Sequence, residues 1–321
     1  MRIKSFWAPG FRSLRDVRID DLGAFNVFYG PNGSGKSNIL AAIELWLRLI
    51  RITLQSDGDR DGGRQTYLDA GAPVRAHDFA LHSPQRRITL GGTLSELGVG
   101  IRCAEIELQL DATVLDKPTL RRVSVTVDGT SLEYDEQATE IQREKLSLLE
   151  NVEWERKISL ISADRMPRIE AVGERPPANV EPLSWYFRCG QLKDALFAAQ
   201  NATSPITVRA LERFREFMAG PPLHRRPFRA VEAPHTGVRD LREWLPPPLD
   251  AHDISLDLAG LGIAQIYWIL GQAMLSGAAV VGIEEPEAHL HAPTTGRHLR
   301  LLLERLVEEK HQMSGHGVRD S

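Results

Sequence analysis

The chain has 321 residues, of which 42% are hydrophobic and 26% are charged, so it can bury one large core or two smaller ones. Its formal net charge of −4 excludes a basic field over the whole molecule, and any contact with nucleic acid would come from a local patch or a partner. The two cysteines, Cys103 and Cys189, lie far apart, which excludes a disulfide framework and a cysteine zinc site. Because the N-terminus also lacks an apolar stretch of signal-peptide length, we expect a cytoplasmic protein.

The first part of the chain has the order strand, loop, helix. Alternating apolar residues predict strands at Arg2–Trp7, Leu14–Asp20 and Ala24–Tyr29. Ser37–Arg51 carries apolar residues at helical spacing and is predicted to be a helix. The glycine-rich, polar stretch 55–71 is predicted to be a loop.

An antiparallel region is predicted after this helix. Residues 86–134 alternate like strands, most clearly over Ile101–Leu110 and Arg121–Val127. The dipeptide Asp128–Gly129 is typical of a tight hairpin and leads into a strand at Thr130–Tyr134. We therefore expect an antiparallel lobe inserted after the first helix.

The remainder of the chain mixes helices and strands. Glu136–Glu150 is predicted to be a helix, Lys157–Ala163 a short strand and Asp194–Met218 one or two helices. The proline-rich stretch Pro221–Pro248 is predicted to be irregular. Thr294–Lys310 is predicted to be a helix.

One long segment without charged residues, Leu258–Ile283, has two interpretations. Its length could cross a bilayer. However, four glycines and two glutamines interrupt it and two glutamates follow it directly. A buried helix followed by a buried strand accounts for the same apolarity, and we favour that interpretation.

The firmest motif is a phosphate-binding loop. Residues 30–37 read GPNGSGKS and match the pattern G-x-x-x-x-G-K-[ST] in its required strand–loop–helix context. Backbone N–H groups and the helix N-terminus supply positive charge to phosphates, and small residues let the backbone approach them. Lys36 adds a full positive charge, and the Ser37 hydroxyl is placed to ligate Mg²⁺. The predicted nucleotide-binding residues are Gly30, Pro31, Asn32, Gly33, Ser34, Gly35, Lys36, Ser37 and Asn38.

The alternative is a glycine turn that precedes a helix by coincidence. A chance match is roughly a one-in-a-hundred event in a chain of this length. No Asn-Lys-x-Asp run supports guanine specificity. We therefore predict that the ligand is ATP with Mg²⁺.

Two acidic residues complete the predicted site. The apolar run 278–283 is suited to a buried strand of a parallel sheet and ends in Glu284 and Glu285. Successive side chains of a strand point to opposite sides, so the two acids have different roles. Glu284 is the candidate for holding Mg²⁺, and Glu285 is the candidate general base that activates water. The alternative is a strand that ends in solvated acids.

A glycine turn at 259–262, with Gly260 and Gly262, opens the apolar helix. A second helix N-terminus with small residues is a second phosphate-binding device, and we expect it to cap the γ-phosphate bound by a partner subunit. ATP would then join a head-to-head homodimer. The alternative is a glycine pair used for helix packing.

Two further groups of residues favour ordinary structural roles. The basic run 224–229 is a candidate for DNA contact, although a solvated loop explains it as well. His77–Asp78, and the pair His289 and His291, lack partners at metal-ligand spacing.

Several segments together carry a resemblance to a known group of ATPases. They are Phe11–Leu14, the GPNGSGKSN run 30–38, Ile161–Arg165, the turn at 259–262, and the EEPEAHLH run 284–291. The chain resembles the ABC-type ATPase heads of the RecF, SMC and OLD group, and within it the AAA-type predicted ATPases of the OLD-like family. GPNGSGKSN and EEPEAHLH are the phosphate-binding (Walker A) and acidic (Walker B) motifs of such heads.

The resemblance implies an α/β P-loop NTPase fold with a mixed, ABC-ATPase-like sheet, an inserted antiparallel β lobe and a helical lobe. Residues 1–305 would form the head. Its core would be split between 1–55 and 250–305, with the β lobe at 80–165 and a helical, irregular lobe at 166–249. Residues 306–321 would form a tail.

The resemblance also implies an ATPase that acts as a motor or switch in DNA repair or phage defence, coupled to DNA or to a nuclease partner. It places Arg12 near the nucleotide and gives Gly260 and Gly262 the role of the signature loop. Relatives continue into a strand ending in a sensor histidine, and OLD nucleases into a Toprim domain; this sequence shows neither. The alternative is therefore a shortened head that binds ATP without hydrolysing it, as a switch or scaffold subunit.

Overall fold

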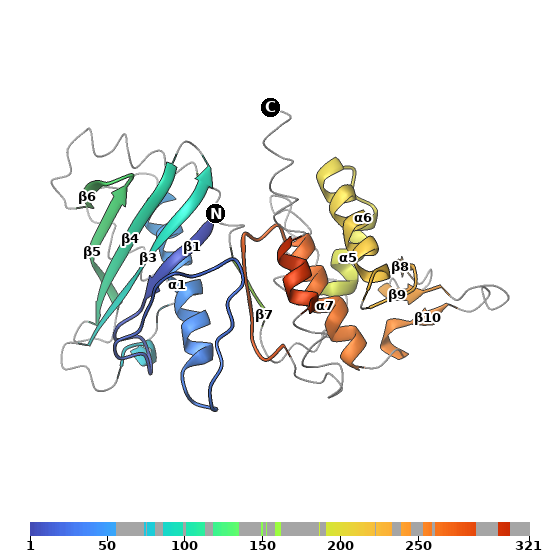
Figure 1. Ribbon diagram of the computed structural model, residues 1–321, viewed down its shortest axis with the longest axis horizontal. Coiled ribbons are helices and arrows are strands. Elements are labelled where there is room, and N and C mark those ends of the chain that lie inside the picture. The colour runs from blue at the N-terminus through green and yellow to red at the C-terminus, as the bar shows by residue number, and fades with distance from the viewer. Residues whose placement is uncertain are drawn as a thin grey trace. The chain divides into compact units, whose positions relative to one another are not determined.

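The computed structural model divides into two compact units, Met1–Ile158 and Ser159–Ser321, and each is considered by itself. The residues that it describes are 1–55, 74, 76–80, 86–98, 101–112, 118–134, 149, 152, 158–161, 186, 191–221, 223–232, 239–244, 253–258, 261–286 and 301–308. Figure 1 labels the helices and strands.

The first unit contains a six-stranded antiparallel sheet with the order β2-β1-β3-β4-β5-β6. Its strands are β1 (Arg2–Trp7), β2 (Arg18–Ile19), β3 (Arg87–Gly98), β4 (Ile101–Ala112), β5 (Pro118–Val127) and β6 (Thr130–Tyr134). The antiparallel strands predicted between residues 86 and 134 are confirmed. They share one sheet with the N-terminal strand β1.

The predicted hairpin turn is also confirmed. Asp128 and Gly129 both have positive φ, 46° and 83°. This is the geometry of the two-residue turn whose twist matches that of the flanking strands. It joins β5 to β6 with Val127 opposite Thr130.

The helix α1 (Lys36–Gln55) confirms the predicted first helix and packs on the sheet (Figure 1). Trp46 on α1 is fully buried, lies 5.7 Å from the Phe6 ring and donates a 3.1 Å hydrogen bond to the Ile106 carbonyl. Gly92 of β3 leaves room for it, because a β-carbon there would lie 2.7 Å from the Trp46 ring and 2.5 Å from the Ser5 carbonyl oxygen. This packing holds the start of α1, and with it the glycine loop, against the sheet.

Of two further N-terminal strand predictions, Leu14–Asp20 is confirmed only over β2 and Ala24–Tyr29 is wrong. Only Arg18–Ile19 of the segment 14–20 pairs in the sheet. Before it, residues 11–14 form a tight turn in which Leu14 N–H donates to the Phe11 carbonyl at 2.8 Å. Ala24–Tyr29 is not a strand in the described structure. Alternation alone does not supply the neighbouring strand that a ladder requires.

The described part of the second unit contains helices and two small sheets. Its helices are α5 (Leu192–Gln200), α6 (Pro205–Ala219) and α7 (Leu261–Leu275), and residues 301–308 are also helical. One sheet has the order β10-β9-β8, with β8 (Phe228–Glu232), β9 (Arg239–Glu243) and β10 (Ile254–Ser255). The other pairs β11 (Val280–Ile283) with β7 (Ile158–Ile161).

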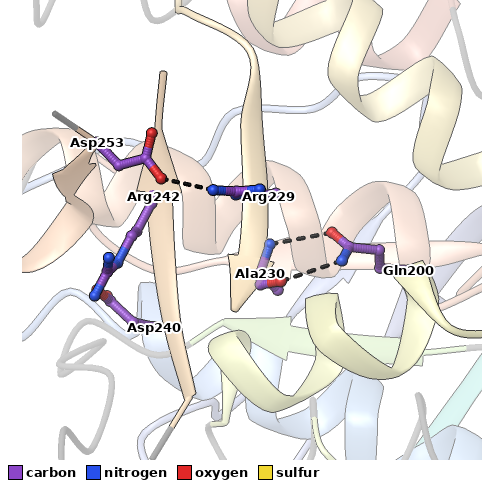
Figure 2. Close-up of polar contacts among 6 residues, drawn as sticks. All are labelled: Gln200, Arg229, Ala230, Asp240, Arg242 and Asp253. Carbon is purple, nitrogen blue, oxygen red and sulfur yellow. Dashed lines mark hydrogen bonds and ion pairs between the residues drawn. The ribbon is translucent and has the colours of Figure 1, made fainter. Parts of the chain in front are cut away.

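The prediction of an irregular stretch at 221–248 is wrong, because it contains β8 and β9. The prolines lie outside these strands, and the inward residues Phe228, Ala230 and Leu241 are buried in the unit's core. Figure 2 shows how the edge of β8 is covered by a side chain: the Gln200 amide exchanges two 3.1 Å hydrogen bonds with the backbone of Ala230. It replaces the strand partner that a free edge lacks.

The predicted apolar helix and buried strand are confirmed as α7 and β11. The α7 residue Tyr267 packs edge-on against Phe214 and Phe228, with ring centroids 6.2 and 5.1 Å away. Its hydroxyl donates a 2.7 Å hydrogen bond to buried Glu243, which also pairs with Arg225. Burial, followed by this hydrogen bond, raises the pKa of Tyr267 far above its usual value, so the phenol stays protonated and anchors α7 to β9.

In the described part of the chain, no helix has the length and apolarity needed to cross a membrane.

Candidate nucleotide-binding site

The glycine loop has a backbone that requires its glycines. Gly33 and Gly35 have φ of 80° and 96°, a region that side chains with a β-carbon rarely adopt. A β-carbon at Gly35 would also lie 3.1 Å from the Leu14 side chain and 3.2 Å from the Ser13 hydroxyl. The loop is therefore seated against the turn at 11–14 and has no space for larger residues at this position.

Lys36, the first residue of α1, folds back over the loop. Its ammonium donates to the carbonyl oxygens of Gly30 at 2.7 Å and Pro31 at 3.0 Å. An ammonium has three donors, so one remains for a ligand. In the described part of the chain, no hydrogen-bond partner is found for the N–H groups of Gly33 and Gly35. These donors, together with the start of α1, fit the phosphate groups of a nucleotide.

The first turn of α1 also carries a metal ligand of the expected kind. Ser37 is exposed, and its hydroxyl oxygen is a hard donor suited to Mg²⁺. Next to it, the Asn38 amide donates a 2.8 Å hydrogen bond to the Ser13 hydroxyl. The residues at this end of α1 thus fit a nucleotide with its metal ion.

Arg12 lies in contact with the same turn of α1. Its Nη1 donates to Asn38 Oδ1 at 3.4 Å, and its Nε donates to Asp78 Oδ1 at 2.8 Å. The sequence prediction placed Arg12 near the nucleotide, and the structure brings it to Asn38; its contact with a nucleotide stays a prediction. The motif did not reveal Asp78, which the sequence offered only as part of a His-Asp pair. The only available signal was an acid followed directly by the apolar residues 79–81.

A cavity of about 830 Å³ adjoins this region of the first unit. It is bounded by the loop 9–15, the turn 76–80 and strand β3. Three arginines and a histidine line it: Arg12, Arg15, Arg87 and His77.

The predicted acids follow β11 in the second unit. The N–H of Glu284 donates to the Ile161 carbonyl at 2.9 Å, and its side chain is half-buried. Glu285 is exposed and has a positive φ of 41°, so the chain turns sharply at the end of the strand. Because the acids and the glycine loop belong to different units, their joint site stays a prediction.

The predicted signature turn is described only in part. Gly262 is the second residue of α7 and is half-buried. Gly260, the segment 162–165 and the run 287–291 lie outside the described residues.

Comparison with known families decides the class of this site. A family described as an AAA domain matches residues 9–210, which include Arg12 and the whole glycine loop. The chain belongs to the AAA domain family. It is therefore a P-loop ATPase head of the RecF and SMC-like kind, with a mixed α/β fold and the use of ATP and Mg²⁺ that this class implies. The match ends before the signature turn and the acids.

A solved structure similar to this AAA-domain protein is titled as the recombination mediator protein RecF with ATPrS, in the RecFOR pathway. It has 11% sequence identity and a TM-score of 0.42, and the match covers 94% of this chain and 90% of that chain. No curated protein sequence matches the chain.

Proposed function

We propose that this protein binds Mg-ATP on the glycine loop and hydrolyses it. The observation that carries the proposal is the geometry at the start of α1: Lys36 retains a donor, the N–H groups of Gly33 and Gly35 have no partner among the described residues, and Ser37 is exposed. Such groups bind the phosphates and the metal ion. Bound ATP supplies the phosphoryl group that is transferred to water.

We propose further that Glu284 and Glu285 act on this nucleotide. Glu284 would hold Mg²⁺, directly or through water, and Glu285 would accept the proton of the attacking water. Support for this comes from the sequence motif and from the position of both residues at the carboxyl end of β11.

The proposed assembly is a homodimer joined by ATP, with the turn at Gly260 and Gly262 capping the γ-phosphate bound to the partner. The proposed biological role is in DNA repair or phage defence, and the proposed partners are DNA or a nuclease. The proposed subfamily is that of the OLD-like ATPases. These proposals rest on the resemblance of the motifs.

Phosphate release by the purified chain tests the proposal. Glu285→Gln should lower the rate of release about 100-fold or more, since it removes the general base, while ATP binding is retained. Light scattering of this variant with ATP should then show the mass of a dimer. Glu212→Gln, an exposed glutamate of α6, is the matched control and should leave the rate unchanged.

Three outcomes contradict parts of the proposal. Release that is unchanged in Glu285→Gln rejects the general base. Tight ATP binding with no release by the unaltered chain supports the alternative of a switch that does not hydrolyse ATP. A monomer in the presence of ATP rejects the dimer.

A further inference from the structure

The turn at residues 76–80 clamps the loop that carries Arg12. The Arg12 N–H donates to the Asp78 carbonyl at 2.7 Å, and the Ala80 N–H donates to the Gly10 carbonyl at 2.9 Å. Between these bonds, Phe11 forms an isolated bridge with Phe79. The backbone around Arg12 is therefore fixed by a segment 66 residues further along the chain.

Arg12 itself has an uncommon backbone conformation, with φ of 48°. A residue with a β-carbon in this region stores strain, and such residues gather at functional sites where the surrounding structure holds them. Here the backbone hydrogen bonds with the turn at 76–80 hold Arg12 in this conformation. In this conformation the Arg12 side chain points toward Asp78 and toward Asn38 of α1.

The Asp78 carboxylate fixes the direction of the Arg12 guanidinium. The Asp78 side chain is only 3% exposed, whereas that of Arg12 is 37% exposed. A buried carboxylate is costly unless it is paired, so the 2.8 Å contact with Nε constrains both side chains. His77 Nε2 lies 3.7 Å from the same oxygen, but this side chain is largely exposed and its contact is weak.

The guanidinium keeps donors free for a ligand. It has five N–H donors; Asp78 occupies Nε, and the contact of Nη1 with Asn38 is long, at 3.4 Å. The terminal nitrogens thus stand beside the first turn of α1, where we propose that phosphates bind. A guanidinium held in this way loses little freedom when it contacts a phosphate.

We propose that Asp78 is a positioning residue, which sets Arg12 so that its terminal nitrogens contact a phosphate of the bound nucleotide. The inference rests on the proposed binding of ATP at the glycine loop. Asp78 acts through Arg12 and touches no reacting atom.

Equilibrium binding of Mg-ATP to four forms of the full chain tests this: unaltered, Asp78→Asn, Arg12→Gln and the double variant. Asparagine keeps the shape and removes the charge, so Asp78→Asn should weaken ATP binding about tenfold. In the Arg12→Gln background the same change should alter the dissociation constant less than about twofold, because the group that Asp78 positions is absent. Asp253→Asn disrupts an ion pair with a half-exposed arginine and a mostly buried carboxylate, Arg229–Asp253 at 2.9 Å in the second unit, and is the matched control with unchanged affinity.

An equal loss of affinity from Asp78→Asn in both backgrounds would overturn the inference, since Asp78 would then act only through the fold. No loss in either background would overturn it as well. If Asp78→Asn does not fold, Arg12→Lys provides the second test. Arginine contacts Asp78 through Nε and keeps its terminal nitrogens for a phosphate, whereas lysine has a single nitrogen position, which does not extend beyond Asp78 when it is paired there. The affinity of Arg12→Lys should therefore fall to that of Arg12→Gln, and retained affinity would contradict the inference. Failure of the unaltered chain to bind ATP would instead reject the proposed function.

Discussion

The buried amide of Gln265 shows how one residue can oppose the stability of its own helix. Gln265 on α7 is fully buried, and neither of its amide atoms has a hydrogen-bond partner in the described structure. Seven residues later on the same helix, Gln272 is also buried. Its amide nitrogen donates to the Ser159 hydroxyl at 2.8 Å, whereas its amide oxygen has no hydrogen-bond partner in the described structure. An unpaired buried polar group costs free energy that a paired one recovers.

Replacing Gln265 with leucine should therefore stabilise the protein. We expect the free energy of unfolding to rise by about 1 to 2 kcal/mol, because the unpaired amide is removed at similar volume. Urea unfolding followed by tryptophan fluorescence measures this. Gln272→Leu is the matched control and should stabilise the protein less than Gln265→Leu, since it removes one unpaired oxygen but also the hydrogen bond to Ser159; a loss of stability in Gln265→Leu would show that the amide has a partner of its own.

The roles and contacts of single residues could be predicted from the sequence to different extents. Gly33, Gly35 and Lys36 were predictable because phosphate chemistry restricts the residue types and their spacing. The contact of Arg12 with Asp78 was not, because it joins residues 66 positions apart through tertiary packing. The hydrogen bond between Tyr267 and Glu243 also joins residues that are distant in the sequence. Hydrophobic periodicity could not predict it.

At the scale of elements, the predictions succeeded where a local pattern was sufficient. The hairpin β5–β6 was predicted from alternation and Asp128–Gly129. Strands β8 and β9 were missed because prolines near them indicated a loop, whereas burial of Phe228 and Leu241 against the helices stabilises strands there. Ala24–Tyr29 was predicted as a strand, but alternation cannot show whether a partner strand is present.

The packing of α1 on the sheet depends on one glycine of β3. Gly92→Ala should lower the free energy of unfolding by about 1 to 3 kcal/mol, because the new β-carbon would lie 2.5 Å from the Ser5 carbonyl oxygen, which cannot move aside. Thermal and urea unfolding measure the loss. Gly23→Ala is the control: its β-carbon would lie 3.5 Å from the nearest atom, so we expect a change below about 0.5 kcal/mol. Equal effects at both glycines would contradict this packing.

At the scale of the whole molecule, the two predicted halves of the nucleotide site lie in different units. The glycine loop belongs to Met1–Ile158, and Glu284 and Glu285 belong to Ser159–Ser321. The sequence motifs predicted both halves. The proposed joint site around one nucleotide would require packing between distant segments, which no local pattern encodes.

Equilibrium binding of Mg-ATP to the unaltered chain and to Lys36→Ala tests the central claim most directly. Isothermal titration should show binding by the unaltered chain and an affinity lower by about tenfold or more in Lys36→Ala, because a charged donor to the phosphates is lost. Removal of Mg²⁺ with a chelator should also weaken binding. Equal affinities of the two proteins would contradict the assignment of the glycine loop as the nucleotide site.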